Sequence, residues 1–275
     1  MSIGGLIRIS FVDPIAKTNK EVEVIKNPIQ EKLESGEVVV NAWLWFGDSF
    51  AAEIMAAQGF DSVTLDLQHG LIGLHEAVTM LQAISSQPVV PLVRVQSNDS
   101  GWIMKMLDAG ALGIICPMIS TREECERFVA ACRYPPVGIR SFGPSRCNAR
   151  YGADYADFAN DSILTFAMIE TRQALENLED ILSVPGLDAV YVGPNDLALA
   201  LGYPPSQDSI EPEVIEAIDR IVTTAIRYKI SPGIACPSGE VARRRIKEGY
   251  RFVTPGNQAG MMAAAARTAI ECVRG

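Results

Sequence analysis

The chain has 275 residues, enough for one large domain such as an α/β barrel or for two ordinary domains. Hydrophobic residues make up 48% of it and charged residues 21%, which is typical of globular proteins and excludes a disordered or fibrous chain. The formal net charge is −9 and the longest basic run is Arg243 to Arg245, which argues against a nucleic-acid partner.

The apolar segments are short. The longest, such as 109–119, cannot cross a bilayer, and the N-terminus lacks the basic-then-apolar pattern of a signal peptide. We therefore expect a cytoplasmic protein with no membrane partner. Six cysteines are scattered without a CxxC pair or a nearby histidine, so we expect free thiols rather than zinc ligands or disulfides.

The first predicted element is a short helix near the N-terminus. Residues 1–26 are polar and weakly patterned, which is typical of an arm. Asn27 is a plausible N-cap, Pro28 suits the first helical position and Gly36 lies just past the end. The sequence thus predicts an N-terminal arm and short helix over 1–36, followed by one domain over 37–275.

Short apolar runs then alternate with segments of helical periodicity. One of these helices opens on a capping box from Thr121 to Glu124. No Gly/Ser-rich or Pro-rich linker divides the chain, so the pattern favours a (β/α)₈ TIM barrel over two doubly wound halves. If the number of strands were miscounted by one, an open parallel sheet would be the alternative. The strand-like runs are 38–43, 62–66, 89–95, 112–116, 163–168, 189–192, 231–235 and 251–253.

Several predicted strands end on polar or aromatic side chains. In a (β/α)₈ barrel the carboxyl ends of the strands form the active face, so these side chains should converge at one mouth. The residues at the strand ends are Trp43, Gln68, His69, Arg94, Pro117, Met118, Glu170, Asn195 and Asp196, of which only Pro117 and Met118 are apolar. No lysine ends a strand there, which disfavours a Schiff-base mechanism.

Glu170 and Asp196 follow two consecutive strands, whose axes lie about 5 Å apart. Two carboxylates without a nearby cysteine or second histidine form a hard oxygen site, suited to Mg²⁺ or Mn²⁺ with water and a chelating substrate. Alternatively, each carboxylate only caps the helix that follows it. Gly193 and Pro194, just before Asn195, form a tight turn whose amides suit a carboxylate or phosphate, although such glycines also occur for turn reasons alone.

Arg94 and His69 are the remaining candidates for chemistry. Arg94 interrupts an apolar strand and needs an anion, which a bound 2-oxo acid or a structural acid such as Asp108 could supply. His69 could act as a general acid or base near neutral pH, whereas a lone histidine is more often a satisfied polar residue. We assign that ordinary role to His75, which lies in a helical stretch.

Four segments of the sequence resemble the HpcH/HpaI aldolase family, which comprises metal-dependent pyruvate aldolases related to citrate lyase. The resemblance covers the chain from about Gly36 to its last residue. These segments are FDSVTLDLQHG (60–70), RYPPVGIRSFG (133–143), MIETRQALENLEDILSVPGLDAVYVGPNDLALALGYP (168–204) and YRFVTPGNQAG (250–260). The resemblance implies a TIM barrel of the phosphoenolpyruvate/pyruvate-binding type. It also implies a homohexamer, built as a trimer of dimers that exchange their last helix.

The resemblance also implies roles for individual residues. Glu170 and Asp196 match the family's ligands for Mg²⁺ or Mn²⁺, with Co²⁺ as an alternative, and the turn from Gly193 through Pro194 and Asn195 to Asp196 matches the backbone that binds the substrate carboxylate. Arg94 matches the arginine that stabilises the enolate. His69 matches the catalytic histidine and Asp108 an acid paired with it, while Trp43 matches an aromatic near the aldehyde end. Many members carry Glu at the position of Gln68, Gln at that of Met168 and Gly at that of Ser141. We expect Gln68 to take part in substrate binding and substrate preference to differ there from the family's usual pattern.

These observations lead to three hypotheses. The main one is a divalent-metal-dependent lyase that reversibly cleaves a 4-hydroxy-2-oxo acid to pyruvate and an aldehyde through a metal-stabilised enolate, with Arg94 polarising the 2-oxo group and His69 handling the 4-hydroxyl proton. An alternative is an oxaloacetate decarboxylase or a citrate-forming condensing enzyme, which uses the same enolate. A third is a non-catalytic, metabolite-binding barrel.

Overall fold

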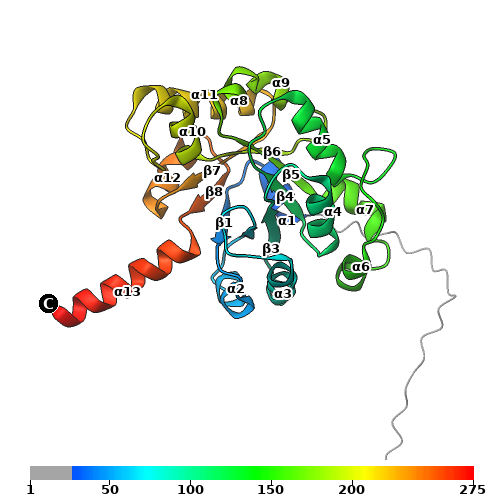
Figure 1. Ribbon diagram of the computed structural model, residues 1–275, viewed down its shortest axis with the longest axis horizontal. Helices are drawn as coiled ribbons and strands as arrows, with labels where there is room; N and C mark the ends of the chain where they lie inside the picture. The colour runs from blue at the N-terminus through cyan, green and yellow to red at the C-terminus, as the bar shows by residue number, and fades with distance from the viewer. Residues whose placement is uncertain (1–26) are drawn as a thin grey trace, which may run out of the picture.

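The computed structural model describes residues 27–275, so the predicted arm over 1–26 lies outside the described residues. Eight parallel strands pair in chain order from β1 to β8, and β1 pairs with β8 to close a barrel (Figure 1). The predicted (β/α)₈ barrel is therefore confirmed. The strands are β1 Val39–Leu44, β2 Ser62–Asp66, β3 Val90–Arg94, β4 Gly113–Cys116, β5 Leu164–Ile169, β6 Ala189–Val192, β7 Ser231–Cys236 and β8 Phe252–Pro255.

Helices connect the successive strands and lie around the outside of the barrel (Figure 1). Two short helices, α6 and α7, extend the connection between α5 and β5 (Figure 1). The described helices are α1 Pro28–Glu34, α2 Ser49–Ala56, α3 Leu74–Ile84, α4 Ser100–Asp108, α5 Arg122–Cys132, α6 Ser145–Tyr151, α7 Tyr155–Ser162, α8 Arg172–Glu176, α9 Leu178–Leu182, α10 Pro194–Leu201, α11 Pro212–Arg227, α12 Gly239–Lys247 and α13 Gln258–Arg274.

Local capping explains where several of these helices begin. The Asn27 side chain accepts from the Ile29 amide at the start of α1, and the predicted capping box at Thr121 and Glu124 opens α5. Asn27 also donates its Nδ2 to the carbonyls of Leu112 and Ser162, 3.0 and 2.9 Å away. The same residue that starts α1 therefore fastens this helix to the barrel.

The strands are buried on both faces, as expected for a parallel barrel whose inner and outer surfaces are both covered. The few polar groups inside are paired with one another. Asn41 accepts hydrogen bonds from the hydroxyls of Ser62 and Thr64 at 2.8 and 2.9 Å and donates to Thr254 at 3.1 Å. These hydrogen bonds satisfy the polar groups of Asn41, Ser62 and Thr64 inside the barrel.

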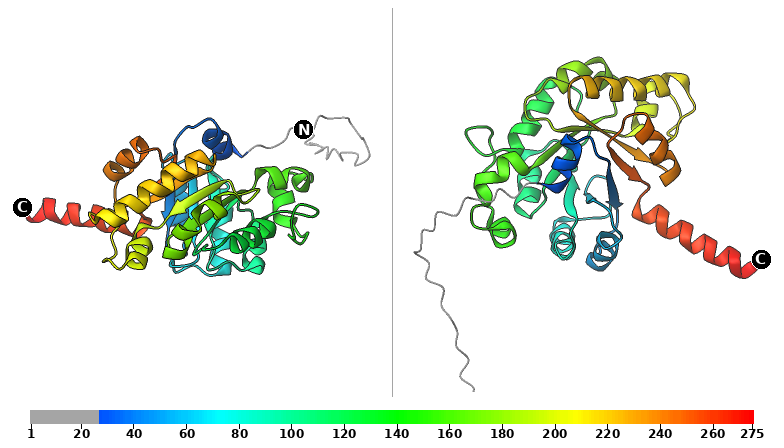
Figure 2. Two further views of the ribbon diagram at one scale, coloured as in Figure 1. Left: turned by 90° about the horizontal axis from the view of Figure 1, so that it is seen from above. Right: turned by 180° about the vertical axis from the view of Figure 1, so that it is seen from behind.

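The last helix, α13, differs from the others because it extends away from the barrel (Figures 1 and 2). Gln258 is its only buried residue, and this side chain accepts from the backbone amides of Trp45 and Phe46. Met262, Ile270 and Val273 are exposed on this helix. Among residues 27–275 there is no helix with the length and apolar character that a bilayer crossing requires.

Candidate active site

A pocket of about 110 Å³ opens at the carboxyl ends of the strands. It contains most of the site residues that the sequence predicts, together with several that it does not. The lining residues are Trp43, Trp45, His69, Arg94, Met168, Tyr191, Gly193, Pro194, Asn195, Asp196, Gln207, Ala235, Cys236, Thr254, Gly256 and Asn257.

The Asp66 carboxylate binds several of the side chains that line the pocket. Strand pairing places it beside Arg94, whose Nε and terminal nitrogen lie 2.8 and 2.5 Å from its two oxygens. The indole nitrogens of Trp43 and Trp45 donate to it at 3.1 and 2.7 Å. Burial raises the pKa of Asp66, but the Arg94 guanidinium and the hydrogen bonds from Trp43 and the His69 amide together more than offset this, so the pKa lies below its usual value. Arg94 therefore pairs with a structural acid, which was one of the two alternatives, but this acid is Asp66 and not Asp108.

This arrangement leaves one end of the Arg94 guanidinium available. Its other terminal nitrogen faces only the Met168 sulfur, 3.9 Å away, which is a weak acceptor. The guanidinium lies over the Trp43 ring, 4.9 Å from the ring centroid. Asp66 and Trp43 together fix the orientation of the guanidinium, and its free end can bind an oxygen anion.

Glu170 is buried, and only one of its two oxygens has a partner. The backbone amide of Met118 donates to Oε1 at 2.9 Å, and Met118 adopts a left-handed backbone with φ of 59°. The other oxygen, Oε2, has no partner within the described residues. Burial raises the pKa of Glu170 to about 7, and the charge of Asp196 contributes. A buried carboxylate oxygen without a partner in the described chain has the properties expected of a ligand for a cation.

Gly193 allows this close approach. A Cβ on Gly193 would lie 2.3 Å from Glu170 Oε2, so only glycine fits there. Asp196 lies in the first turn of α10, whose N-cap is Gly193 and which has no side-chain cap, while Thr171 caps α8. The alternative that Glu170 and Asp196 merely cap helices is therefore wrong.

Glu170 and Asp196 suit a hard divalent cation. Both provide carboxylate oxygens, and Asp196 lines the pocket. No group of three or more His, Cys, Asp or Glu side chains that could hold a metal occurs in the part of the chain that the structure describes. A cation at this position would take its remaining ligands from water and from substrate, which leaves open positions for chemistry.

The turn after β2 carries Gln68 and His69. Their backbone amides donate to Asp66 at 3.0 and 3.2 Å, so the same carboxylate that holds Arg94 also shapes this turn. The His69 side chain is exposed and lines the pocket. The Gln68 Oε1 is buried without a partner among residues 27–275, and Gln68 does not line the pocket. His75 is exposed on α3, away from the pocket.

Asp108 lies at the end of α4 and binds Arg140, with 2.8 Å between Oδ1 and the guanidinium nitrogen. Arg140 is fully buried and also donates to the Tyr155 hydroxyl at 3.0 Å. Its guanidinium stacks on the Tyr134 ring at 4.4 Å. Within the described residues, Asp108 makes no hydrogen bond to His69 or Arg94 and does not line the pocket.

Several pocket residues were not predicted from the sequence. Trp45 lies two residues after Trp43, and the alternation of side chains along a strand could have placed it on the same face. Tyr191 stacks on Trp43 with ring centroids 5.3 Å apart. Gln207 lies in a loop and Asn257 follows the last strand. No sequence pattern could have placed Gln207 and Asn257 in the pocket, because the conformation of the loops decides where these residues lie.

The prediction of free thiols is confirmed. All six cysteines are free, and only Cys272 is exposed. Burial raises the pKa of Cys125, Cys132 and Cys236 to about 12. These thiols stay protonated near neutral pH, and Cys236 is therefore a small apolar wall of the pocket rather than a nucleophile.

The model of the HpcH/HpaI aldolase/citrate lyase family matches residues 42–265 of this chain. The chain belongs to this family. It is therefore a lyase of the aldolase type, and its closed barrel is the fold that the resemblance implied.

Individual relatives are similar over nearly the whole chain. The hydroxypyruvate/pyruvate aldolase of Rhizorhabdus wittichii is 42% identical over 248 residues, 90% of this chain and 99% of the relative. The 4-hydroxy-2-oxo-heptane-1,7-dioate aldolase of Salmonella dublin is 36% identical over 242 residues, 87% of this chain and 91% of the relative. The crystal structure of a family protein from Burkholderia cenocepacia superposes with a TM-score of 0.86 at 28% identity, covering 91% of this chain and 100% of that one.

Proposed function

We propose that the protein is a divalent-metal-dependent aldolase that reversibly cleaves a 4-hydroxy-2-oxo acid into pyruvate and an aldehyde. In cleavage the 4-hydroxyl loses its proton, the bond between C3 and C4 breaks, and its electron pair remains on pyruvate as an enolate that is then protonated at C3. The observation that carries this proposal is the buried, unpartnered Oε2 of Glu170, close to Asp196 and to the pocket that Arg94 lines.

Arg94 would bind the 2-oxo oxygen through the guanidinium nitrogen that Asp66 leaves free. Negative charge accumulates on this oxygen as the enolate forms, so a fixed positive charge stabilises the transition state more than the ground state. Asp66 supports this role by holding the other two nitrogens at 2.8 and 2.5 Å. The arginine then needs no reorientation during the reaction.

Glu170 and Asp196 would hold Mg²⁺ or Mn²⁺, with Co²⁺ as an alternative. When bound, such a cation supplies Lewis-acid polarisation of the substrate's 2-oxo group. The first turn of α10 would bind the substrate carboxylate. Pro194 has no amide hydrogen, so the donors are the backbone amides of Asn195 and Asp196, at the positive end of the helix dipole.

His69 would take the proton from the 4-hydroxyl in cleavage and return it in condensation. The support for this role is its exposed position at the pocket mouth and a side chain free of hydrogen bonds within the described residues. Trp43 would border the aldehyde end, and Gln68 would act through its neighbour His69. Asp108 binds Arg140 in the described chain and makes no contact with His69 there. Pairing of Asp108 with His69 therefore stays a prediction.

The test is incubation with pyruvate and short aldehydes, with and without EDTA, followed by analysis of the aldol products. We expect turnover that disappears on metal removal and returns with Mg²⁺ or Mn²⁺. Turnover that survives complete metal removal would contradict the mechanism. Carbon dioxide release from oxaloacetate without any aldol product would instead favour the decarboxylase alternative, and condensation of oxaloacetate to citrate would favour the citrate-forming one.

We also propose a homo-oligomer, a hexamer built as a trimer of dimers, in the cytoplasm. Support for assembly comes from α13, which extends from the barrel with one buried residue and exposed Met262, Ile270 and Val273. An apolar stripe that residues 27–275 leave exposed is expected to pack against a second copy. Support for a reducing compartment comes from the six free thiols.

A further inference from the structure

The side of the pocket next to β7 and β8 is lined by uncharged residues, whereas the side that would hold the 2-oxo acid contains charged ones. Glu170 and Asp196 follow β5 and β6, and Arg94 ends β3. Ala235 and Cys236 at the end of β7, Gly256 and Asn257 after β8, and Gln207 form the remaining side. This side would hold the aldehyde, and its residues are uncharged.

The charge of the lining residues restricts what this side can bind. Arg94 is the only Lys or Arg among the described residues that line the pocket, and two of its three nitrogens are bound to Asp66. An aldehyde with a carboxylate at its far end would find no free cation there. An uncharged aldehyde therefore fits this side better.

The free hydrogen-bonding groups on this side are amides. The Tyr191 hydroxyl is already used, since it donates to Thr254 at 2.9 Å. Asn257 caps α13 through its Oδ1, which accepts from the Gly260 amide, and its side-chain nitrogen remains available. Gln207 has no side-chain hydrogen bond within residues 27–275 and lines the pocket. Its amide can both donate to and accept from a hydroxyl group.

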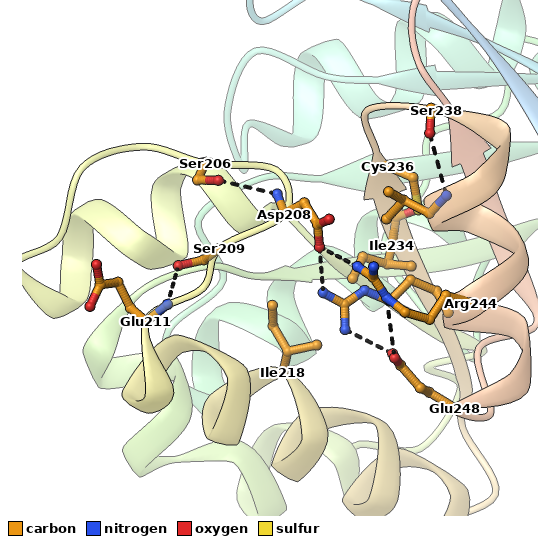
Figure 3. Close-up of polar contacts among 12 residues, drawn as sticks. Ser206, Asp208, Ser209, Glu211, Ile218, Ile234, Cys236, Ser238, Arg244 and Glu248 are labelled. Carbon is orange, nitrogen blue, oxygen red and sulfur yellow. Dashed lines mark hydrogen bonds and ion pairs between the residues drawn. The ribbon is translucent and has the colours of Figure 1, made fainter.

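Gln207 lies in the loop between α10 and α11, and its neighbour in sequence fastens this loop to α12. Asp208 forms an ion pair with Arg244 (Figure 3). It forms a second ion pair with Arg245, whose side chain is 5% exposed. Glu248 completes the cluster, 2.8 Å from Arg245 and 3.6 Å from Arg244. We call these four residues, Asp208, Arg244, Arg245 and Glu248, the loop clamp.

The loop clamp includes a buried arginine, Arg245, whereas charged side chains near surface loops are mostly exposed. Two carboxylates share two guanidinium groups, and the Arg245 Nε is buried without a partner in the described part of the chain. Ser209, the next residue, is buried as well, and its hydroxyl accepts from the Glu211 amide (Figure 3). The residues that follow Gln207 are therefore fixed against the barrel.

We infer that Gln207 binds the aldehyde and selects for short, uncharged aldehydes that carry a hydroxyl group, and that the loop clamp positions Gln207 for this task. The inference rests on the proposed function and names the aldehyde class for that same site. Gln207 contacts the substrate, whereas Asp208 is a positioning residue that acts through it. The walls formed by Trp45, Ala235 and Cys236 limit the length of the aldehyde.

The experiment compares the aldol rates of pyruvate with glycolaldehyde, propanal and succinate semialdehyde. Exchange of the pyruvate methyl protons in D₂O serves as the aldehyde-independent readout. We expect the parent protein to prefer glycolaldehyde over propanal, and Gln207→Leu to reduce this preference by about fivefold to tenfold, the effect of one neutral hydrogen bond. Gln207→Arg should increase the rate with succinate semialdehyde relative to the other two.

The positioning role is tested with Asp208→Asn, and Asp219→Asn is the matched control because Asp219 is exposed on α11 and outside the loop clamp. We expect Asp208→Asn to raise KM for glycolaldehyde several-fold while KM for pyruvate stays unchanged, and Asp208→Glu to restore part of the effect. If methyl-proton exchange is present but the preference among aldehydes does not change in Gln207→Leu, the inference is wrong. If exchange is absent from the parent protein, the proposed function fails instead.

Discussion

The Asp66 carboxylate faces the Arg94 guanidinium with both oxygens, at 2.8 Å from Nε and 2.5 Å from the terminal nitrogen. The pair is closed off from solvent, since the Asp66 side chain is fully buried and the Arg94 side chain is 8% exposed. This two-point contact requires the planar fork of arginine and cannot be reproduced by a single ammonium group.

We therefore expect Arg94→Lys to lower kcat/KM by about a hundredfold, because lysine can engage only one Asp66 oxygen and loses the oriented free nitrogen. The same change should reduce the free energy of unfolding by about 3 kcal/mol, as expected for a broken buried pair. Urea denaturation and aldol assays measure the two effects.

The control for Arg94→Lys is Arg122→Lys, since Arg122 forms an exposed pair with Glu126 at 2.7 Å on α5. We expect it to change stability by less than about 0.5 kcal/mol. Equal effects of the two substitutions would show that the Asp66 contact adds nothing beyond an ordinary surface pair.

A second prediction concerns metal binding. Thermal unfolding of the parent protein should shift upward with Mn²⁺, by the equivalent of about 2.7 kcal/mol at a hundredfold excess over the dissociation constant. Glu170→Gln should remove most of this shift while the protein remains folded. Glu176→Gln, an exposed carboxylate on α8, should leave the shift intact. A parent protein whose melting temperature ignores Mn²⁺ would count against the metal site.

A third prediction concerns pH. Burial, and to a smaller degree the charge of Asp196, raises the pKa of Glu170 to about 7, above the value of 4.5 in an unfolded chain. A raised carboxyl pKa contributes stability that is present below pH 4.5 and is lost as the pH rises to about 7. In the metal-free protein we expect this contribution to be about 3 kcal/mol. The difference in unfolding free energy between the parent protein and Glu170→Gln, measured across this window, isolates it.

The same titration affects the cation. Because binding requires the ionised carboxylate, the affinity for Mn²⁺ should fall by up to about tenfold for each pH unit below 7, with release of a proton at lower pH. Calorimetry in two buffers of different ionisation enthalpy measures that proton. An affinity that is constant from pH 5 to 7 would mean that Glu170 is already ionised in the metal-free protein.

A fourth prediction separates two roles for Asp108. Its contact with the buried Arg140 implies a structural role, so Asp108→Asn should destabilise the protein by about 2 kcal/mol because Arg140 loses its charged partner. Adding Arg140→Met should recover part of this loss, since no buried charge remains unpaired. If Asp108→Asn instead lowers kcat and changes its pH profile at unchanged stability, Asp108 acts with His69.

A fifth prediction concerns assembly through α13. Met262, Ile270 and Val273 recur at helical spacing and are exposed, so they form one apolar stripe. Ile270→Glu together with Val273→Glu should reduce the mass measured by light scattering to that of a smaller assembly. Thr268→Glu, off this stripe on the same helix, is the control. An unchanged mass in the double variant would exclude this stripe as the contact.

Much of the fold could be predicted because buried parallel strands are short apolar runs between polar or glycine-containing segments. The runs 62–66 and 189–192 match β2 and β6 to the residue. Elsewhere the ends differ by one or two residues, as at Val38, which is apolar but does not pair with β2 or β8. Hydrophobicity reports burial, whereas a strand end depends on backbone pairing.

The sequence by itself determined the barrel, the family and the residues that end the strands, because strand alternation, helix caps and strand-end positions are local properties. It could not determine which side chains pair. Asp66 rather than Asp108 holds Arg94, since the β2 and β3 register brings residues 28 positions apart to within 2.5 Å. Likewise Gln207 lines the pocket and its neighbour Asp208 pairs with Arg244 and Arg245, which come from a distant segment of the sequence. Ion pairs and loop positions depend on distances in the folded chain, which no spacing in the sequence specifies.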